Sequence, residues 1–164
     1  MAVVKAGSAP PTDYQTVGFH FNVLFENLPD GTAADVRFQS ATGLDVSFDV
    51  ENWKEGGENR FEHSFPGRRR YADLTLKRGL LLPVHSGLTE WFSEAFQNFS
   101  VKPLETVLVQ LLDEKGKPLV VWKLAHVWPK SWKIGELNAE RSDVLIETLE
   151  LHYNRFEYIM PAGK

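Results

Sequence analysis

Alternation of apolar and polar residues is the dominant pattern of the chain, and it predicts β-strands. Apolar side chains occupy every second position from Val17 to Phe25, which is typical of a strand with one buried face. A short second strand is predicted over residues 37–41. The alternation returns over residues 45–51, where a third strand is expected to bury its apolar positions: Val46, Phe48 and Val50.

Further strands follow in the second half of the chain. The pattern predicts a fourth strand from Tyr71 to Lys77 and a final one from Val144 to Tyr153. Between them, Leu104–Leu112 and Leu119–Val127 flank a short polar, glycine-containing connection, which predicts an antiparallel hairpin. We expect Trp128 to Asp143 to be irregular.

One segment has the periodicity of a helix. From Leu88 to Phe99 the apolar residues recur at three- and four-residue spacings, as on an amphipathic helix. Ser86 is a suitable N-cap and Pro103 a suitable stop. We expect the helix to pack on the sheet through three aromatic side chains: Trp91, Phe92 and Phe96.

These elements predict a mainly β fold, an antiparallel β-sandwich or barrel of about seven strands with one flanking α-helix. The length of 164 residues suits a single domain. We divide the chain into an N-terminal arm (1–16), the β-domain (17–153) and a C-terminal extension (154–164).

The segment from Asn52 to Arg70 separates the third and fourth strands and is predicted to be a long loop. It combines Gly56-Gly57, interleaved charges and several aromatic residues. Long loops in small domains are usually functional or interfacial. Because this loop contains no catalytic constellation, we interpret it as an interface.

Composition offers little support for an enzyme or a metal site. There is no cysteine, and the five histidines lack the close spacing of zinc ligands. No nucleophile elbow, phosphate-binding loop or dinucleotide fingerprint is present. The carboxylates Asp45, Asp49, Glu51 and Glu147 could form a dyad, but solvated strand faces carry such acidic series routinely. We therefore expect no catalytic residue, no metal and no cofactor.

Charge and hydropathy limit the kinds of binding partner that the chain is expected to have. The formal net charge is −4, so the chain as a whole does not attract polyanions. Arg68-Arg69-Arg70 lies among glutamates, which favours ion pairs with a neighbouring subunit over nucleic acid, although a solvated charged turn explains it equally well. For these reasons we expect no specific nucleic-acid binding. No apolar run is long enough to cross a bilayer, so we also expect no membrane insertion.

An ordered set of short motifs resembles the tail-tube proteins of contractile phages and related bacterial injection systems. The resemblance extends from about Val17 to Tyr153. Its motifs are Ala41–Leu44, Lys54–Gly57, Pro66-Gly67, Leu74–Gly79, Val107–Gly116, Val121–Lys123, Val127–Pro129 and Ile146–Leu151.

The resemblance implies an assembly. Tail-tube proteins form homohexameric rings that stack into a hollow tube, with a contractile sheath outside and a hub, spike and baseplate at one end. Strand addition between subunits closes the inner barrel, and the loop after the third strand reaches the adjacent ring. The implied location is a contractile particle assembled in the bacterial cytoplasm.

A polar strand face would then line the lumen of the tube, where an acidic wall would repel acidic cargo. Two strands offer such a face. The residues expected there are Asp45, Ser47, Asp49, Glu51, Thr148, Glu150, His152 and Asn154.

The long loop and the C-terminal extension supply the expected contacts between subunits, rings or baseplate. The sequence departs from common tube subunits in both segments, and this favours the tube initiator, the first ring on the hub. The contact residues are Trp53, Lys54, Glu55, Glu58, Arg60, Phe61, Phe65, Arg68, Arg69, Arg70, Phe156 and Tyr158.

Three alternatives remain open. The chain could be the main repeating tube subunit rather than the initiator. It could also be a small-ligand β-barrel carrier, which requires a hollow apolar interior. A hydrolase on a β-sandwich is the third. Rings or tubes in electron micrographs would distinguish the tube family from the other two classes.

Overall fold

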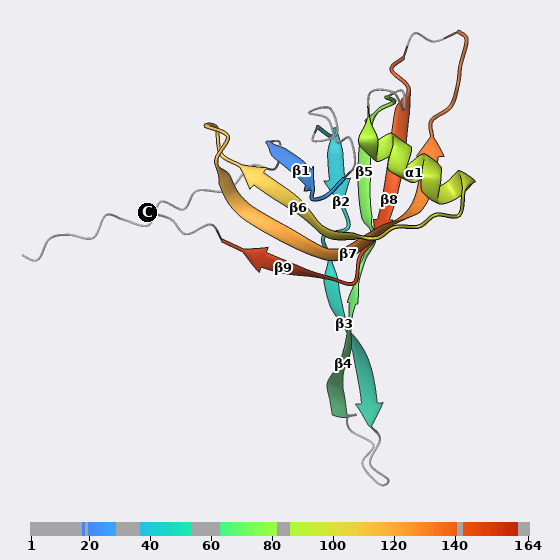
Figure 1. Ribbon diagram of the computed structural model, residues 1–164. Coiled ribbons are helices and arrows are strands. Elements are labelled where there is room, and N and C mark those ends of the chain that lie inside the picture. The colour runs from blue at the N-terminus through green and yellow to red at the C-terminus, as the bar shows by residue number, and fades with distance from the viewer. Residues whose placement is uncertain are drawn as a thin grey trace, which may run out of the picture.

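The computed structural model describes residues 18, 20–28, 37–53, 63–81, 86–140 and 143–160. These residues form nine strands and one helix (Figure 1). The strands are β1 (Phe21–Phe25), β2 (Ser40–Thr42), β3 (Val46–Trp53), β4 (His63–Tyr71), β5 (Leu74–Gly79), β6 (Leu104–Leu112), β7 (Pro118–Ile134), β8 (Ile146–His152) and β9 (Arg155–Ile159), and the helix is α1 (Gly87–Gln97).

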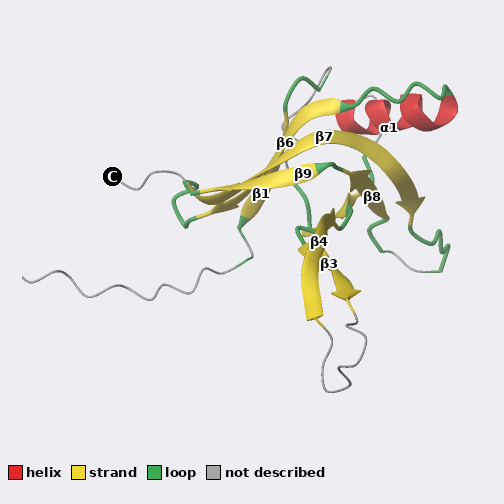
Figure 2. Ribbon diagram, turned by 90° about the horizontal axis from the view of Figure 1, so that it is seen from below, coloured by secondary structure: helices red, strands yellow, loops and turns green. Residues whose placement is uncertain are grey.

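Seven of the strands form one antiparallel sheet in the order β1-β6-β7-β8-β5-β2, with β9 also paired to β7. The long strand β7 organises this sheet. Its first part pairs with β6 on one edge and β9 on the other, and its last part pairs with β8. β7 curves strongly through the molecule (Figure 2). The change of partner occurs next to His126, whose φ is 57°, and a register shift between Pro129 and Ser131.

The predicted fold class is confirmed: an antiparallel, mainly β domain with one flanking helix. Helix α1 lies on the main sheet, and the core fills the space between them. β8 shows the expected alternation, with Leu149 and Leu151 completely buried. The predicted N-cap is also correct, since the Ser86 hydroxyl accepts a hydrogen bond of 3.1 Å from the Thr89 amide.

The helix ends earlier than its apolar pattern predicts. α1 stops at Gln97, and Phe99 follows with a φ of 53° and an exposed fraction of 94%. Trp91 and Phe92 are buried as expected, but Phe96 is 44% exposed, so its assignment to the core is wrong. Because the chain leaves the helical path after Gln97, Phe99 does not continue the apolar stripe of the helix.

The predicted long loop is wrong for the part that the structure describes. Residues 63–71 form β4, which pairs with β3 in a separate two-stranded hairpin. Pro66 and Gly67 lie at a register shift of the hairpin rather than in a loop. Such an irregularity tolerates proline, because no ladder hydrogen bond is lost there. Residues 54–62 lie outside the described part.

Three other boundaries also differ from the prediction. Trp128 to Ile134, expected to be irregular, is the last part of β7, and Pro129 is buried within it. β5 begins at Leu74 rather than Tyr71. Residues 155–159, assigned to a C-terminal extension, form β9 within the main sheet. Proline and the short length of β9 concealed these strands in the sequence.

The backbone at Gly43 explains why the motif Ala41–Leu44 requires a glycine. Its φ is +94°, and a Cβ built there would lie 1.8 Å from the Asp73 carbonyl oxygen. Only glycine accepts this conformation and this close approach. The Gly43 carbonyl also accepts a 2.8 Å hydrogen bond from the Tyr153 hydroxyl, so this turn fixes the base of β3 to the end of β8.

Candidate interaction surfaces

The β3–β4 hairpin projects from the body of the molecule (Figure 1). One face of β3 carries Val46, Phe48 and Val50, which are 47%, 57% and 66% exposed. Their predicted burial is therefore wrong within the single chain, because none of the other described elements covers this face. Contiguous exposed apolar faces are typical of interaction sites, so this face is a candidate for one.

The other face of the hairpin is polar near its base and aromatic toward its far end. At the base, Arg70 and Asp49 form an ion pair of 2.5 Å within the chain. Toward the far end lie Trp53 and Phe65, which are 67% and 56% exposed. The His63 and Phe65 rings stack with their centroids 6.4 Å apart.

The hairpin brings together some of the expected contact residues but not all. Trp53, Phe65 and the arginines 68–70 share it, and all are exposed. Tyr158 lies elsewhere, on β9, half-exposed against the Trp122 ring. The remaining loop residues predicted for contact lie outside the described part: Lys54, Glu55, Glu58, Arg60 and Phe61.

Phe156 is placed differently from the prediction. Its ring packs against Tyr71 and Tyr153, with centroid distances of 5.4 and 6.2 Å, next to the hydrophobic core. β9 directs this side chain into its own subunit. Phe156 therefore stabilises the fold, and Tyr158 is the aromatic residue of β9 that remains accessible.

The polar face of β8 is present as predicted from its alternation: Thr148, Glu150 and His152 alternate with buried residues. This face is not an acidic wall, however. Lys133 on β7 contacts Glu150 at 2.5 Å, and Lys130 forms an ion pair with Asp73. The expected acidic character is thus corrected to a mixed, largely paired set of charges. Sequence alternation identifies a face but not the cross-strand partners that neutralise it.

Asp73 sits at the centre of this charged face. Its Oδ1 lies 2.7 Å from His152 Nδ1, and its Oδ2 accepts from Lys130. Burial by itself would raise the pKa of Asp73, but the hydrogen bonds from Lys130 and His152 outweigh burial and the pKa is lowered.

We expect Asp73 to contribute to acid stability. A carboxyl with a lowered folded-state pKa stabilises the protein above its unfolded pKa of about 4, and loses that contribution as the pH falls through the folded pKa. The Asp73→Asn variant should therefore be less stable than wild type at pH 7 and approach it at about pH 2. Urea denaturation at both pH values measures this, and an unchanged difference would contradict the assignment.

Glu147 is not the solvent-facing carboxylate that a catalytic dyad would need. It is completely buried, with Arg78 Nε 2.5 Å from Oε1 and Trp132 Nε1 donating to Oε2 at 3.0 Å. Arg78 also donates to Ser86 and Thr89 at the start of α1. This network connects the helix to β5, β7 and β8. A sequence signal existed, because both charged residues fall in phase with the buried positions of their strands.

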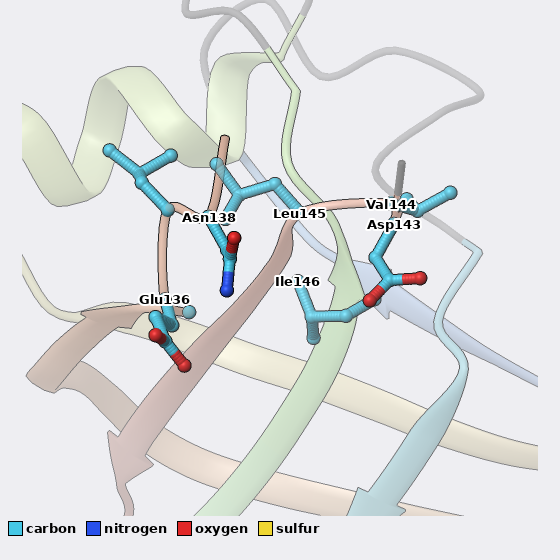
Figure 3. A pocket seen from close by; sticks show the side chains of 8 residues that line it. Glu136, Asn138, Asp143, Val144, Leu145 and Ile146 are labelled. Atoms are coloured by element: carbon cyan, nitrogen blue, oxygen red, sulfur yellow. The ribbon is translucent and has the colours of Figure 1, made fainter. Parts of the chain in front are cut away.

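The β7–β8 connection forms a second surface that the sequence did not reveal. A cavity of about 290 Å³ opens between its two limbs (Figure 3). Leu137 and Val144 line it and are 81% and 74% exposed. The other lining residues are Gly135, Glu136, Asn138, Asp143, Leu145 and Ile146. Within the described residues, no group of three histidine or acidic side chains is placed to hold a metal ion.

Comparison with known proteins identifies the family. The profile described as T4-like virus tail tube protein gp19 matches residues 17–157. The chain belongs to the tail tube family. Comparison with curated proteins gives no match. No helix in the described residues has the length and apolar character needed to cross a membrane.

Solved structures of other tail-tube-like chains resemble this one. A chain from the six-fold symmetrised baseplate of the anti-feeding prophage is 32% identical, with a TM-score of 0.78, covering 90% of this chain and 97% of that one. A chain of the sheath-tube complex of an extracellular contractile injection system is 20% identical, with a TM-score of 0.75 and coverage of 92% and 95%. An Hcp protein shares the fold at 14% identity, with a TM-score of 0.52 and coverage of 85% and 98%.

This chain is thus a tail tube-type structural protein of a contractile phage-tail-like particle. The lumen and contact assignments of individual residues remain predictions.

Proposed function

We propose that this chain forms a homohexameric ring of the inner tube and that the ring is the tube initiator, which joins the hub and baseplate to the tube. The role is structural, with no catalytic activity and no cofactor. Assembly takes place in the bacterial cytoplasm, and the sheath surrounds the tube. The observation that carries the ring proposal is the uncovered apolar face of the hairpin.

The physical argument for a ring is the exposure of Val46, Phe48 and Val50 to water in the single chain. Burial of such side chains stabilises by about 1.5–3 kcal/mol each. A neighbouring copy that covers this face would supply that energy, and successive copies related by one rotation close into a ring. The edge strands of the sheet would then pair between copies rather than remain open.

Two observations support placing the ring at the baseplate. The relative that is 32% identical was solved as part of a baseplate. Tyr158 is half-exposed on β9, in the segment where the sequence departs from common tube subunits, and is available for a hub or baseplate partner. The main repeating subunit remains the alternative role within the same family.

In such a ring the lumen would be lined by the polar faces of β3 and β8. These include Asp49, Glu51, Thr148 and Glu150. Asp49 is paired with Arg70 and Glu150 with Lys133, so we expect a wall that is polar but not strongly acidic. Cargo would slide along it because no patch of one sign holds it.

The ring proposal predicts that Phe48→Asp abolishes oligomers while leaving the monomer folded. Phe48 is 57% exposed in the single chain, so the substitution costs the monomer little, whereas it would bury a charge in the ring. The matched control is Ser47→Asp, which adds the same charge to the opposite face of the strand. Size-exclusion chromatography with light scattering measures the outcome, and equal oligomerisation of both variants would contradict the proposed interface.

The initiator role predicts where the protein lies in a particle. Immunogold labelling of sheathed particles should place it only at the baseplate end. Label along the whole tube would identify the main repeating subunit instead. If the protein is the initiator, Tyr158→Ser should reduce the number of sheathed particles. The substitution should not change the thermal stability of the isolated protein by more than a few degrees.

A further inference from the structure

We propose that the C-terminal strand β9 sets the direction of the β3–β4 hairpin within its own chain, through the ring of Phe156. This inference rests on the ring-forming function proposed above. It makes Phe156 a positioning residue for assembly, because the direction of the hairpin decides how its apolar face is presented to a neighbouring copy.

The hairpin is joined to the body at its base. Among the described strands, β3 and β4 pair with each other alone. The turn at Gly43 leads into the hairpin, and Ala72 and Asp73 lead out of it to β5. A hydrogen bond of 3.2 Å from the Ala72 amide to the Asp45 carbonyl closes the base. Short connections of this kind act as hinges unless side chains hold them, so contacts at the base decide where the hairpin points.

Three aromatic rings meet at this base, and one of them belongs to the hairpin. Tyr71 is the last residue of β4, Tyr153 follows β8, and Phe156 lies on β9. The Tyr71 ring centroid lies 5.9 Å from that of Tyr153 and 5.4 Å from that of Phe156, and the latter two are 6.2 Å apart. Both Tyr71 contacts are edge-on, which is a favoured geometry for aromatic pairs. The hairpin is therefore held at Tyr71 by two rings of the body.

Tyr153 and Phe156 hold the base in different ways. Tyr153 is 1% exposed, and its hydroxyl donates to the Gly43 carbonyl at 2.8 Å, so it fixes the turn that leads into β3. Phe156 is only half-buried and is brought to the base by β9, whose start lies beside the hairpin (Figure 1). Among the described strands, β9 pairs with β7 alone. The place of β9 on β7 therefore determines whether the cluster is complete.

This arrangement couples β9 to assembly. Without the Phe156 ring, the hairpin would sample many directions, and only a fraction of the molecules would present the apolar face correctly. The apparent affinity between copies falls in proportion to that competent fraction. A decrease of the fraction to about one tenth would weaken association about tenfold. β9 lies where the sequence departs from common tube subunits, so the coupling is a feature of this chain.

Distance measurements between two spin labels test the coupling directly. The chain contains no cysteine, so labels are placed by Glu51→Cys on the hairpin and Glu90→Cys on α1, both exposed positions. The labelled chain carries Phe48→Asp, which keeps it monomeric, so that each distance comes from one chain. Electron–electron double resonance should give a narrow distance distribution, and Phe156→Ala should make it wider.

A graded series distinguishes loss of the ring from general destabilisation. Phe156→Tyr keeps the ring and should keep the narrow distribution. Phe156→Leu keeps apolar bulk in the fold but removes the edge-on contacts, and should widen the distribution less than Phe156→Ala. The matched control is Tyr158→Ala on the same strand, because Tyr158 contacts Trp122 rather than Tyr71. This control should leave the distribution unchanged.

Association of the unlabelled chain, with Phe48 restored, tests the consequence for assembly. Phe156→Ala should require about tenfold higher protein concentration to reach the wild-type fraction of rings in sedimentation velocity. Phe156→Tyr and Tyr158→Ala should match wild type.

The outcomes separate this inference from the function beneath it. Equally narrow distributions for wild type, Phe156→Leu and Phe156→Ala would overturn the positioning role, whether or not rings form. A wider distribution with unchanged association would overturn the link to assembly. If the unsubstituted chain forms no rings in native mass spectrometry, the proposed function fails, while the distance comparison still tests the positioning of the hairpin by β9.

Discussion

Trp91→Ala is expected to lower the free energy of unfolding by about 3–5 kcal/mol, the range found for large aromatic truncations in cores. Trp91 is 4% exposed and contacts Phe92 edge-on, with ring centroids 5.5 Å apart. Its Nε1 also donates a 2.9 Å hydrogen bond to the Lys102 carbonyl, which fixes the chain after the helix. The substitution removes this bond and leaves a cavity beneath α1.

Urea denaturation of the isolated protein measures this loss, with Phe99→Ala as the control. Phe99 is 94% exposed, so its truncation should change stability by no more than about 0.5 kcal/mol. Similar midpoints for wild type and Trp91→Ala would mean that α1 does not pack on the sheet as described.

Breaking the buried Arg78–Glu147 pair is the second large effect we expect. Both side chains are almost completely buried and lie 2.5 Å apart. Arg78→Met leaves the Glu147 charge without its main partner, which should cost about 3–5 kcal/mol. The helix start should loosen as well, because Arg78 donates to Ser86 and Thr89.

The double variant Arg78→Met/Glu147→Leu is the informative control. Removing both charges eliminates the unpaired ion, so the double variant should be more stable than Arg78→Met alone. If the two losses simply add in a full double-mutant cycle, the residues do not interact and the network is misassigned. Hydrogen exchange of the first turn of α1 would report the loosening separately.

Much of the fold follows from local sequence patterns. β8 could be predicted because its alternation is strict and one face is buried by its own subunit. The β6–β7 hairpin and the N-cap at Ser86 depend only on neighbouring residues, and both are present as predicted. Such features need no knowledge of the rest of the molecule.

The elements that the sequence missed depend on distant partners. β4 contains Pro66 and Gly67, which normally end strands, and among the described strands it pairs with β3 alone. The last part of β7 contains Pro129 and continues because β8 lies beside it. β9 is short, and its place was not apparent without its partner strand.

The candidate surfaces show a second limit of prediction from sequence. Alternation in β3 indicates that Val46, Phe48 and Val50 form one apolar face, but not which molecule covers it. Within the single chain they are exposed. The cavity of the β7–β8 connection left no periodic signal, because its residues come from two limbs of an irregular segment.

Native mass spectrometry of the purified full chain, and of rings released from sheathed particles, tests the central claim most directly. The account predicts a dominant species of six times the 18.6 kDa chain mass from both sources. A protein that remains monomeric at high concentration, and is also released as monomers from intact particles, would contradict it.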